Sequence, residues 1–145
     1  MRRFGAAALL VLLGPSASAA QDGGTDCPWA GPAPARIGVE RLLCRGGWCE
    51  INVRDEDGVR LHRFSTEPVI QELADDAVEG PAEGDVIVAV DDALITTREG
   101  GRRLANLVAG VPVRLRLRRD GRSLEVLATP VPGCPTGGLS VRVPG

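Results

Sequence analysis

Between residues 37 and 129 the chain alternates short apolar runs with turn-forming residues, a pattern typical of a small domain built mainly from strands. In several runs apolar and polar residues alternate, which predicts strands with one buried and one exposed face. The run 86–90 is apolar at every position and is therefore expected at the centre of the sheet. The predicted strands, in chain order, are 38–43, 49–54, 59–64, 69–73, 86–90, 113–118 and 123–129.

One main helix is predicted at 97–108, where Leu104 and Leu107 fall on one face. Thr96 and Glu99 stand at capping-box spacing and are expected to open this helix. It is followed directly by the last two strands, which a tight turn joins into a half-exposed hairpin.

Glycines weaken the predicted helix. Gly100 and Gly101 each cost about 1 kcal/mol relative to alanine, so packing against the rest of the fold must hold the helix in place. A second helix of one or two turns is predicted in the acidic stretch 74–83, just before the turn at Gly84 and Asp85.

The succession of strand, tight turn, short strand, capped helix and strand pair, with Gly84 and Asp85 at its head, resembles the second half of a PDZ domain. PDZ domains are small modules that recognise chain ends or internal peptide segments. The resemblance to the bacterial exported type extends over about 37–129. It implies an α+β fold within the α/β class: a strongly bent antiparallel sheet or partial β-barrel, capped by one main helix and one short helix.

The resemblance also implies where a ligand lies. Residues 47–53 look like the segment that leads through the carboxylate-binding loop into the peptide-pairing strand. In the family the ligand adds as an antiparallel strand between that strand and the helix, the mode called β-augmentation. The peptide-binding residues implied in this way are Trp48, Cys49, Glu50, Ile51, Asn52, Val53, Arg98 and Arg102.

The chain departs from the family pattern at two positions. Glu50 stands where the family prefers glycine, and its charge opposes a carboxylate guest by about 1 kcal/mol or more. Pro81 stands at a usual leucine position. Recognition of a terminus and recognition of an internal segment therefore both stay open, and so does a PDZ-shaped domain with a lost groove. Trp48 either caps the groove or covers a neighbouring disulfide.

Four cysteines in an exported chain indicate two disulfides, for which three pairings are possible. A bridge between Cys44 and Cys49 is sterically feasible over its short loop. Because the ends of a PDZ-like fold lie near each other, the resemblance favours Cys27 with Cys134 beside that bridge. A zinc site is the alternative, but the chain lacks the CxxC pairs that such sites use.

The first twenty residues are predicted to be a signal peptide. Arg2 and Arg3 precede the apolar run 6–13, and small residues at 17–19 suit cleavage near residues 19–20. The organisation we expect is a signal peptide at 1–20, a flexible leader at 21–36, a PDZ-like domain at 37–130 and a disulfide-tied tail at 131–145. The mature protein is then soluble, not inserted in a membrane, and periplasmic or secreted.

Charge is unevenly distributed along the chain. Residues 21–92 hold 16 acidic residues and 6 arginines, whereas residues 93–145 hold 3 acidic residues and 9 arginines. Either the two halves attract each other across one fold, or they form a polar binding surface. The net charge of −2 and the lack of basic residues interleaved with aromatics argue against a nucleic-acid partner.

No catalytic residue, cofactor or metal site is expected, so the protein is not predicted to be an enzyme. His62 is the single histidine, and its place in a predicted hairpin suits an exposed position. The chain contains no lysine, which excludes Ser/Lys chemistry. A bound metal, or an activity that depends on His62, would contradict this interpretation. Paired carboxylates occur at Asp75 and Asp76 and at Asp91 and Asp92, but consecutive acids in turns are more often solvated or helix-capping than catalytic. Cation binding by Asp55, Glu56 and Asp57 is conceivable, but these residues lack the spacing of a calcium loop.

These patterns together predict an exported interaction module that binds an extended peptide or protein segment by strand addition. The alternative is a structural or regulatory protein, such as an inhibitor or assembly factor. It would have a degenerate groove and act through the arginine-rich face of Arg114, Arg116 and Arg118. The sequence leaves the ligand and the oligomeric state open.

Overall fold

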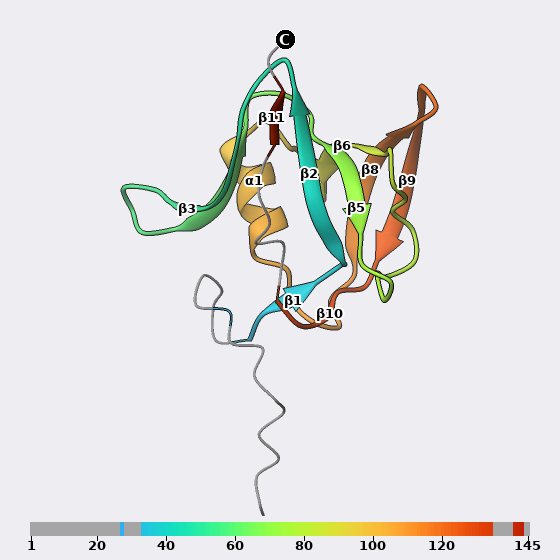
Figure 1. Cartoon of the computed structure of the whole chain (residues 1–145). Helices are drawn as coiled ribbons and strands as arrows, with labels where there is room; N and C mark the ends of the chain where they lie inside the picture. Colours follow the sequence, from blue (N-terminus) through green and yellow to red (C-terminus); the bar gives the residue numbers. More distant parts are fainter. Residues whose placement is uncertain (1–26, 28–32, 135–140, 144–145) are drawn as a thin grey trace, which may run out of the picture.

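The structure is a computed structural model that describes residues 27, 33–134 and 141–143 (Figure 1). One helix and eleven strands are formed in these residues. They are β1 (Ala35–Arg36), β2 (Val39–Arg45), β3 (Cys49–Arg54), β4 (Arg60–Phe64), β5 (Val69–Leu73), β6 (Val86–Val90), β7 (Ala93–Leu94), α1 (Arg98–Ala105), β8 (Val113–Arg119), β9 (Arg122–Ala128), β10 (Val131–Pro132) and β11 (Val141–Val143).

Seven of these strands form the main sheet, in the order β11-β2-β5-β6-β8-β9 with β7 paired to β6. Its neighbouring pairs are antiparallel, except that β11 runs parallel to β2. β3 and β4 form a separate hairpin, and β1 pairs with β10. The sheets stay open instead of closing into a barrel. The predicted α+β fold, mostly antiparallel with one helix and consistent with a PDZ-like domain, is confirmed.

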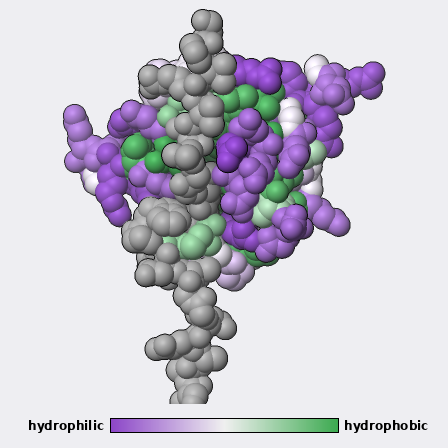
Figure 2. Space-filling model, in the orientation of Figure 1, coloured by the Kyte–Doolittle hydropathy of each residue, from purple (hydrophilic) through white to green (hydrophobic). Residues whose placement is uncertain are grey.

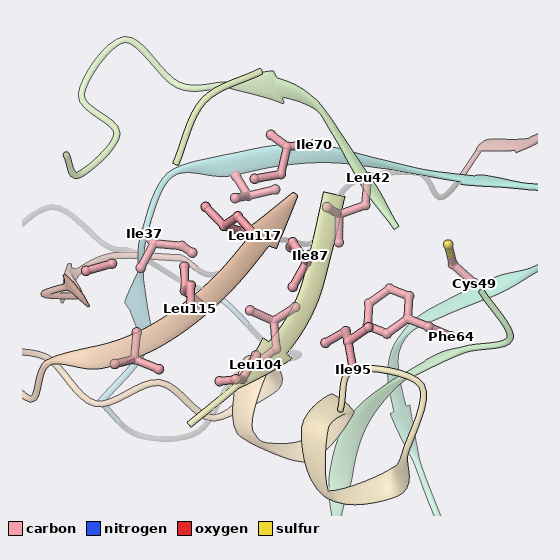
Figure 3. Packing of buried hydrophobic residues seen from close by; sticks show 14 of the residues in the cluster. Ile37, Leu42, Cys49, Phe64, Ile70, Ile87, Ile95, Leu104, Leu115 and Leu117 are labelled. Atoms are coloured by element: carbon pink, nitrogen blue, oxygen red, sulfur yellow. The ribbon is translucent and has the colours of Figure 1, made fainter. Parts of the chain in front are cut away.

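Strands β3, β5 and β6 have the predicted bounds, and β2, β4, β8 and β9 differ by at most two residues at an end. The apolar strand β6 lies between β5 and β8, as its sequence predicted. Ile87, Leu104 and Phe64 point toward one another in the core, with side chains of the sheet around them (Figure 3). Helix α1 is therefore held by its packing on the sheet and on the hairpin.

The helix begins one residue later than predicted. Thr97, not Thr96, is the N-cap, and its hydroxyl oxygen accepts a hydrogen bond from the Gly100 N–H at 3.2 Å. Glu99 does not close a capping box because Arg102 and Arg103 donate hydrogen bonds to its carboxylate. These bonds, that of Arg102 first, lower the pKa of Glu99 to about 2.

The short helix predicted in 74–83 is wrong, because this segment consists of turns. Its backbone bonds to the start of the domain instead: Ala74 N–H donates to Gly38 O at 2.8 Å, and Val78 N–H to Ile37 O at 3.0 Å. Gly80 has a φ of 120°, which a right-handed helix cannot contain.

Asp85 anchors the turn that follows. Its buried carboxylate accepts two hydrogen bonds of 2.8 Å from Arg119 and one of 2.7 Å from the Ala82 N–H. Burial alone raises the pKa of a carboxyl, but these donors outweigh it and lower the pKa of Asp85. The turn is thereby fixed to β8 at the start of the central strand.

Both predicted disulfides are present. The Cα atoms of Cys27 and Cys134 lie 5.6 Å apart, and those of Cys44 and Cys49 lie 6.0 Å apart. β1 pairs with β10, so paired structure begins two residues before the predicted domain start at residue 37 and extends into the predicted tail.

The predicted signal peptide 1–20 and most of the leader lie outside the described residues, which also hold no helix long and apolar enough to cross a membrane.

Candidate functional site

The groove predicted between residues 49–53 and the helix is not formed. Strand β4 lies in that place, paired with β3 on one side and packed against α1 on the other. In this hairpin Cys49 faces Phe64, Glu50 faces Arg63, and Val53 faces Leu61. The prediction that a ligand adds between β3 and the helix is therefore wrong in its geometry.

A helix glycine explains why β4 fits so closely. A side chain at Gly101 would overlap the carbonyl oxygen of His62 in β4. The backbones of α1 and β4 are thus in direct contact, with no room for a peptide between them. Gly100 permits a second close approach, to the carbonyl oxygen of Leu94 in β7. The sequence showed both glycines as helix-weakening residues, and the structure shows that they permit these approaches.

His62 is buried, so its predicted exposed position is wrong. α1 and β3 cover β4 from two directions, which buries both Leu61 and His62 although they are successive in the strand. The His62 Nδ1 accepts a 3.0 Å hydrogen bond from the N–H of Asn52, where β3 bulges with a φ of 56°. Desolvation, and then the charge of Arg60, lower the pKa of His62 to about 4.

The other residues predicted to bind peptide are dispersed. Cys49 is buried in its disulfide, Ile51 packs against the core, and Glu50 is an exposed ion-pair partner of Arg63 at 3.5 Å. Arg102 lines a separate hollow near the C-terminal end of α1. Contact of these residues with a partner stays a prediction.

Trp48 and Arg98 do come together. They line one cleft of about 240 Å³ between β4 and the N-terminal end of α1. The Trp48 residue is 40% exposed at this cleft. The cleft is lined by Trp48, Leu61, His62, Arg63, Phe64, Thr96, Thr97 and Arg98.

The two arginines of this cleft, Arg63 and Arg98, both form ion pairs with acidic side chains. Arg98 Nε donates to Asp55 Oδ2 at 3.0 Å, and this bond is the main reason that the pKa of Asp55 is lowered. Arg63 lies beside Glu50. The cleft therefore combines apolar walls with a rim of arginines whose charges are balanced by neighbours.

The second candidate is the outer edge of β2. Val141–Val143 pairs with it in parallel, opposite Leu43, Cys44 and Arg45. Beside this edge a narrow apolar hollow lies between β2 and α1, lined in part by Val39, Leu42, Leu104 and Leu107. No strand was predicted for this part of the tail. The alternation of valine and arginine at 141–143 fits a strand, but three residues are too few to predict one.

The arginine-rich face of β8 is neutralised within the fold. Arg114 pairs with Asp92, Arg116 with Glu125 at 3.6 Å, and Arg118 with Glu67 at 3.1 Å. The acidic and basic halves of the chain thus attract each other across one domain. The face in Figure 2 is mostly hydrophilic, with small, separate apolar patches.

In the described part of the chain no group of three His, Cys, Asp or Glu side chains is placed to hold a metal ion. No protein-family model matches the chain, and no curated protein matches it. Among solved structures the chain is similar to the HtrA-type protease AlgW with decapeptide, at a TM-score of 0.46 and 19% sequence identity. The match covers 69% of this chain and 30% of that chain.

Proposed function

We propose that this protein is an exported, PDZ-like module that binds an extended segment of another protein by strand addition to the outer edge of β2. The observation that carries the proposal is the pairing of β11, an extended segment, with this edge. The binding strand is thus β2 and not β3, which sequence resemblance had indicated.

The edge suits this role physically. Without β11, β2 is the last strand of the main sheet, and a sheet edge pairs readily with an added chain. Backbone hydrogen bonds then supply affinity, and neighbouring pockets supply selectivity.

The Trp48 cleft extends this surface. β2 ends at Arg45, three residues before Trp48, so a ligand parallel to β2 that continues past Arg45 approaches the cleft within a few residues. Aromatic side chains contribute much of the binding energy at protein interfaces, and the cleft offers the half-exposed ring of Trp48.

Export and the absence of catalysis belong to the same proposal. The two disulfides support an oxidising compartment, periplasmic or extracellular. His62 is buried and its Nδ1 is engaged by the backbone, which argues against a role as a general base. The arginine face is the weaker candidate surface because each of its arginines has an acidic neighbour.

The test is a selection of random linear peptides on the full-length mature protein. We expect selected peptides to lose at least tenfold in affinity when Trp48→Ala is introduced, because the cleft wall is removed. Leu127→Ala is the matched control, since Leu127 is 72% exposed on β9, and it leaves affinity unchanged.

Strand addition itself is tested by methylating the backbone nitrogens of a selected peptide, which removes ladder donors and keeps the side chains. Loss of binding supports the proposal. Undiminished binding of the methylated peptide, or failure to select any peptide, would overturn it.

A further inference from the structure

We infer, on the basis of the proposed function, that Val141–Val143 is a built-in ligand of the β2 edge. A partner segment runs parallel to β2, as this strand does, and binds only by displacing it.

Both edges of β2 are in use where β11 lies. On one side Leu42 and Leu43 pair with Ile70 and Val69 of β5, and on the other side Leu43 pairs with Val141. A strand has only two hydrogen-bonding edges. A partner segment therefore cannot add opposite Leu43 while β11 is in place (Figure 1).

The direction of the ligand follows from the register. Val141, Arg142 and Val143 face Leu43, Cys44 and Arg45 in increasing order, and this is the one parallel pair among the strands described. The sequence Val-Arg-Val places β-branched residues at both ends, a composition that favours extended backbone. We therefore expect ligands with alternating β-branched and polar residues.

A short tether makes this strand an effective competitor. Cys134 is fixed by its bridge to Cys27 and lies just after β10, which pairs with β1. Six residues, 135–140, join Cys134 to Val141. A tether of this length gives an effective concentration on the order of millimolar. If the free strand binds with a dissociation constant of about 0.1 mM, it weakens an external ligand about tenfold.

The experiment compares the full-length mature protein with the double variant Val141→Pro, Val143→Pro. Proline lacks the N–H that a ladder needs, so the variant strand leaves the edge. The probe is a fluorescent peptide with the sequence of residues 139–145, Leu-Ser-Val-Arg-Val-Pro-Gly. We expect it to bind the variant at least tenfold more tightly than the unchanged protein. The double variant Val141→Thr, Val143→Thr is the control: it keeps both N–H groups and the β-branched shape, and it binds as the unchanged protein does.

Direction is tested with a nitroxide spin label on the N-terminal residue of the 139–145 peptide, bound to the ¹⁵N-labelled variant. In the parallel pair Val141 faces Leu43 and Val143 faces Arg45, so we expect the label to broaden the amide signal of Leu43 more than that of Arg45. Stronger broadening at Arg45 would overturn the parallel assignment.

The outcomes separate this inference from the proposed function. One outcome is that the variant and the unchanged protein bind the 139–145 peptide equally well, and likewise bind library-selected peptides equally well. This result overturns the assignment of β11 as a built-in ligand, but it does not contradict strand addition by a partner. Failure of both proteins to bind any peptide overturns the proposed function. If the prolines unfold the domain, hydrogen exchange of the unchanged protein is measured instead, with and without a selected peptide. Equal protection of the Leu43 to Arg45 amides in both samples supports pairing of β11 with β2 in the free protein. Lower protection without the peptide contradicts that pairing.

Discussion

At the scale of single residues, burial determines the chemistry of His62. Its imidazole is 1% exposed, accepts the Asn52 N–H, and packs edge-on to Phe64 with ring centroids 6.1 Å apart. A protonated Nδ1 would be a second donor facing the Asn52 N–H, so this hydrogen bond requires the neutral ring. His62 thus closes the bulge between β3 and β4 and is a structural residue.

This arrangement predicts a pH-dependent stability. The folded-state pKa of His62, about 4, lies below its ordinary value of 6.5, so the unfolded chain binds the proton more tightly. Stability is full above pH 6.5 and falls as the pH drops toward 4. We expect a loss of about 2.5 kcal/mol in unfolding free energy between pH 7.5 and 4.5.

Chemical denaturation at both pH values measures this loss. His62→Gln retains an acceptor without titrating in this range and serves as the comparison. A variant with the same difference in unfolding free energy between pH 7.5 and 4.5 as the unchanged protein would show that His62 is not the titrating group.

At the scale of elements, the contact between α1 and β4 decides where a ligand cannot bind. Gly101 lets the helix backbone reach the carbonyl group of His62 in β4. The groove that the PDZ resemblance indicated at β3 is thereby closed, and the apolar face of α1 turns to the sheet, where Leu104 packs.

Gly101→Ala tests this contact. Alanine favours an isolated helix by about 1 kcal/mol, but here its Cβ would overlap the His62 carbonyl oxygen. Overpacking of this kind costs about 1–3 kcal/mol, and the net expected result is a loss of stability. Thermal unfolding measures it, with Ala109→Gly as an exposed control outside the helix. An increase in melting temperature for Gly101→Ala would contradict the close contact.

The sequence predicted where most strands lie along the chain, but it did not predict which elements pack against one another. Strands β3, β5 and β6 follow from local apolar patterns, and the Cys44 to Cys49 bridge from a short loop. The burial of His62 was missed because it depends on α1, which is distant in sequence. β11 was missed because three residues in a tail rich in proline and glycine give little periodicity, and their pairing with β2 is set by the tertiary fold.

At the scale of the whole molecule, a disulfide and two short strand pairs connect the segments that flank the domain to the edge proposed to bind a partner. The bridge from Cys27 to Cys134 and the β1–β10 pair fix the start of the tail, and the tail returns to β2 as β11. On the β8 face, ion pairs between the acidic and basic halves of the chain neutralise the arginine charges. The β2 edge with the Trp48 cleft is thus the surface at which a partner chain is expected.

The most direct test of this account is an NMR titration of the ¹⁵N-labelled full-length mature protein with a library-selected peptide. We expect the largest shift changes at the amides of Leu43 to Arg45 and at the Trp48 indole, because the ligand replaces β11 and reaches the cleft. Largest changes at residues 114–118 of β8 or 50–53 of β3, with β2 unchanged, would contradict it.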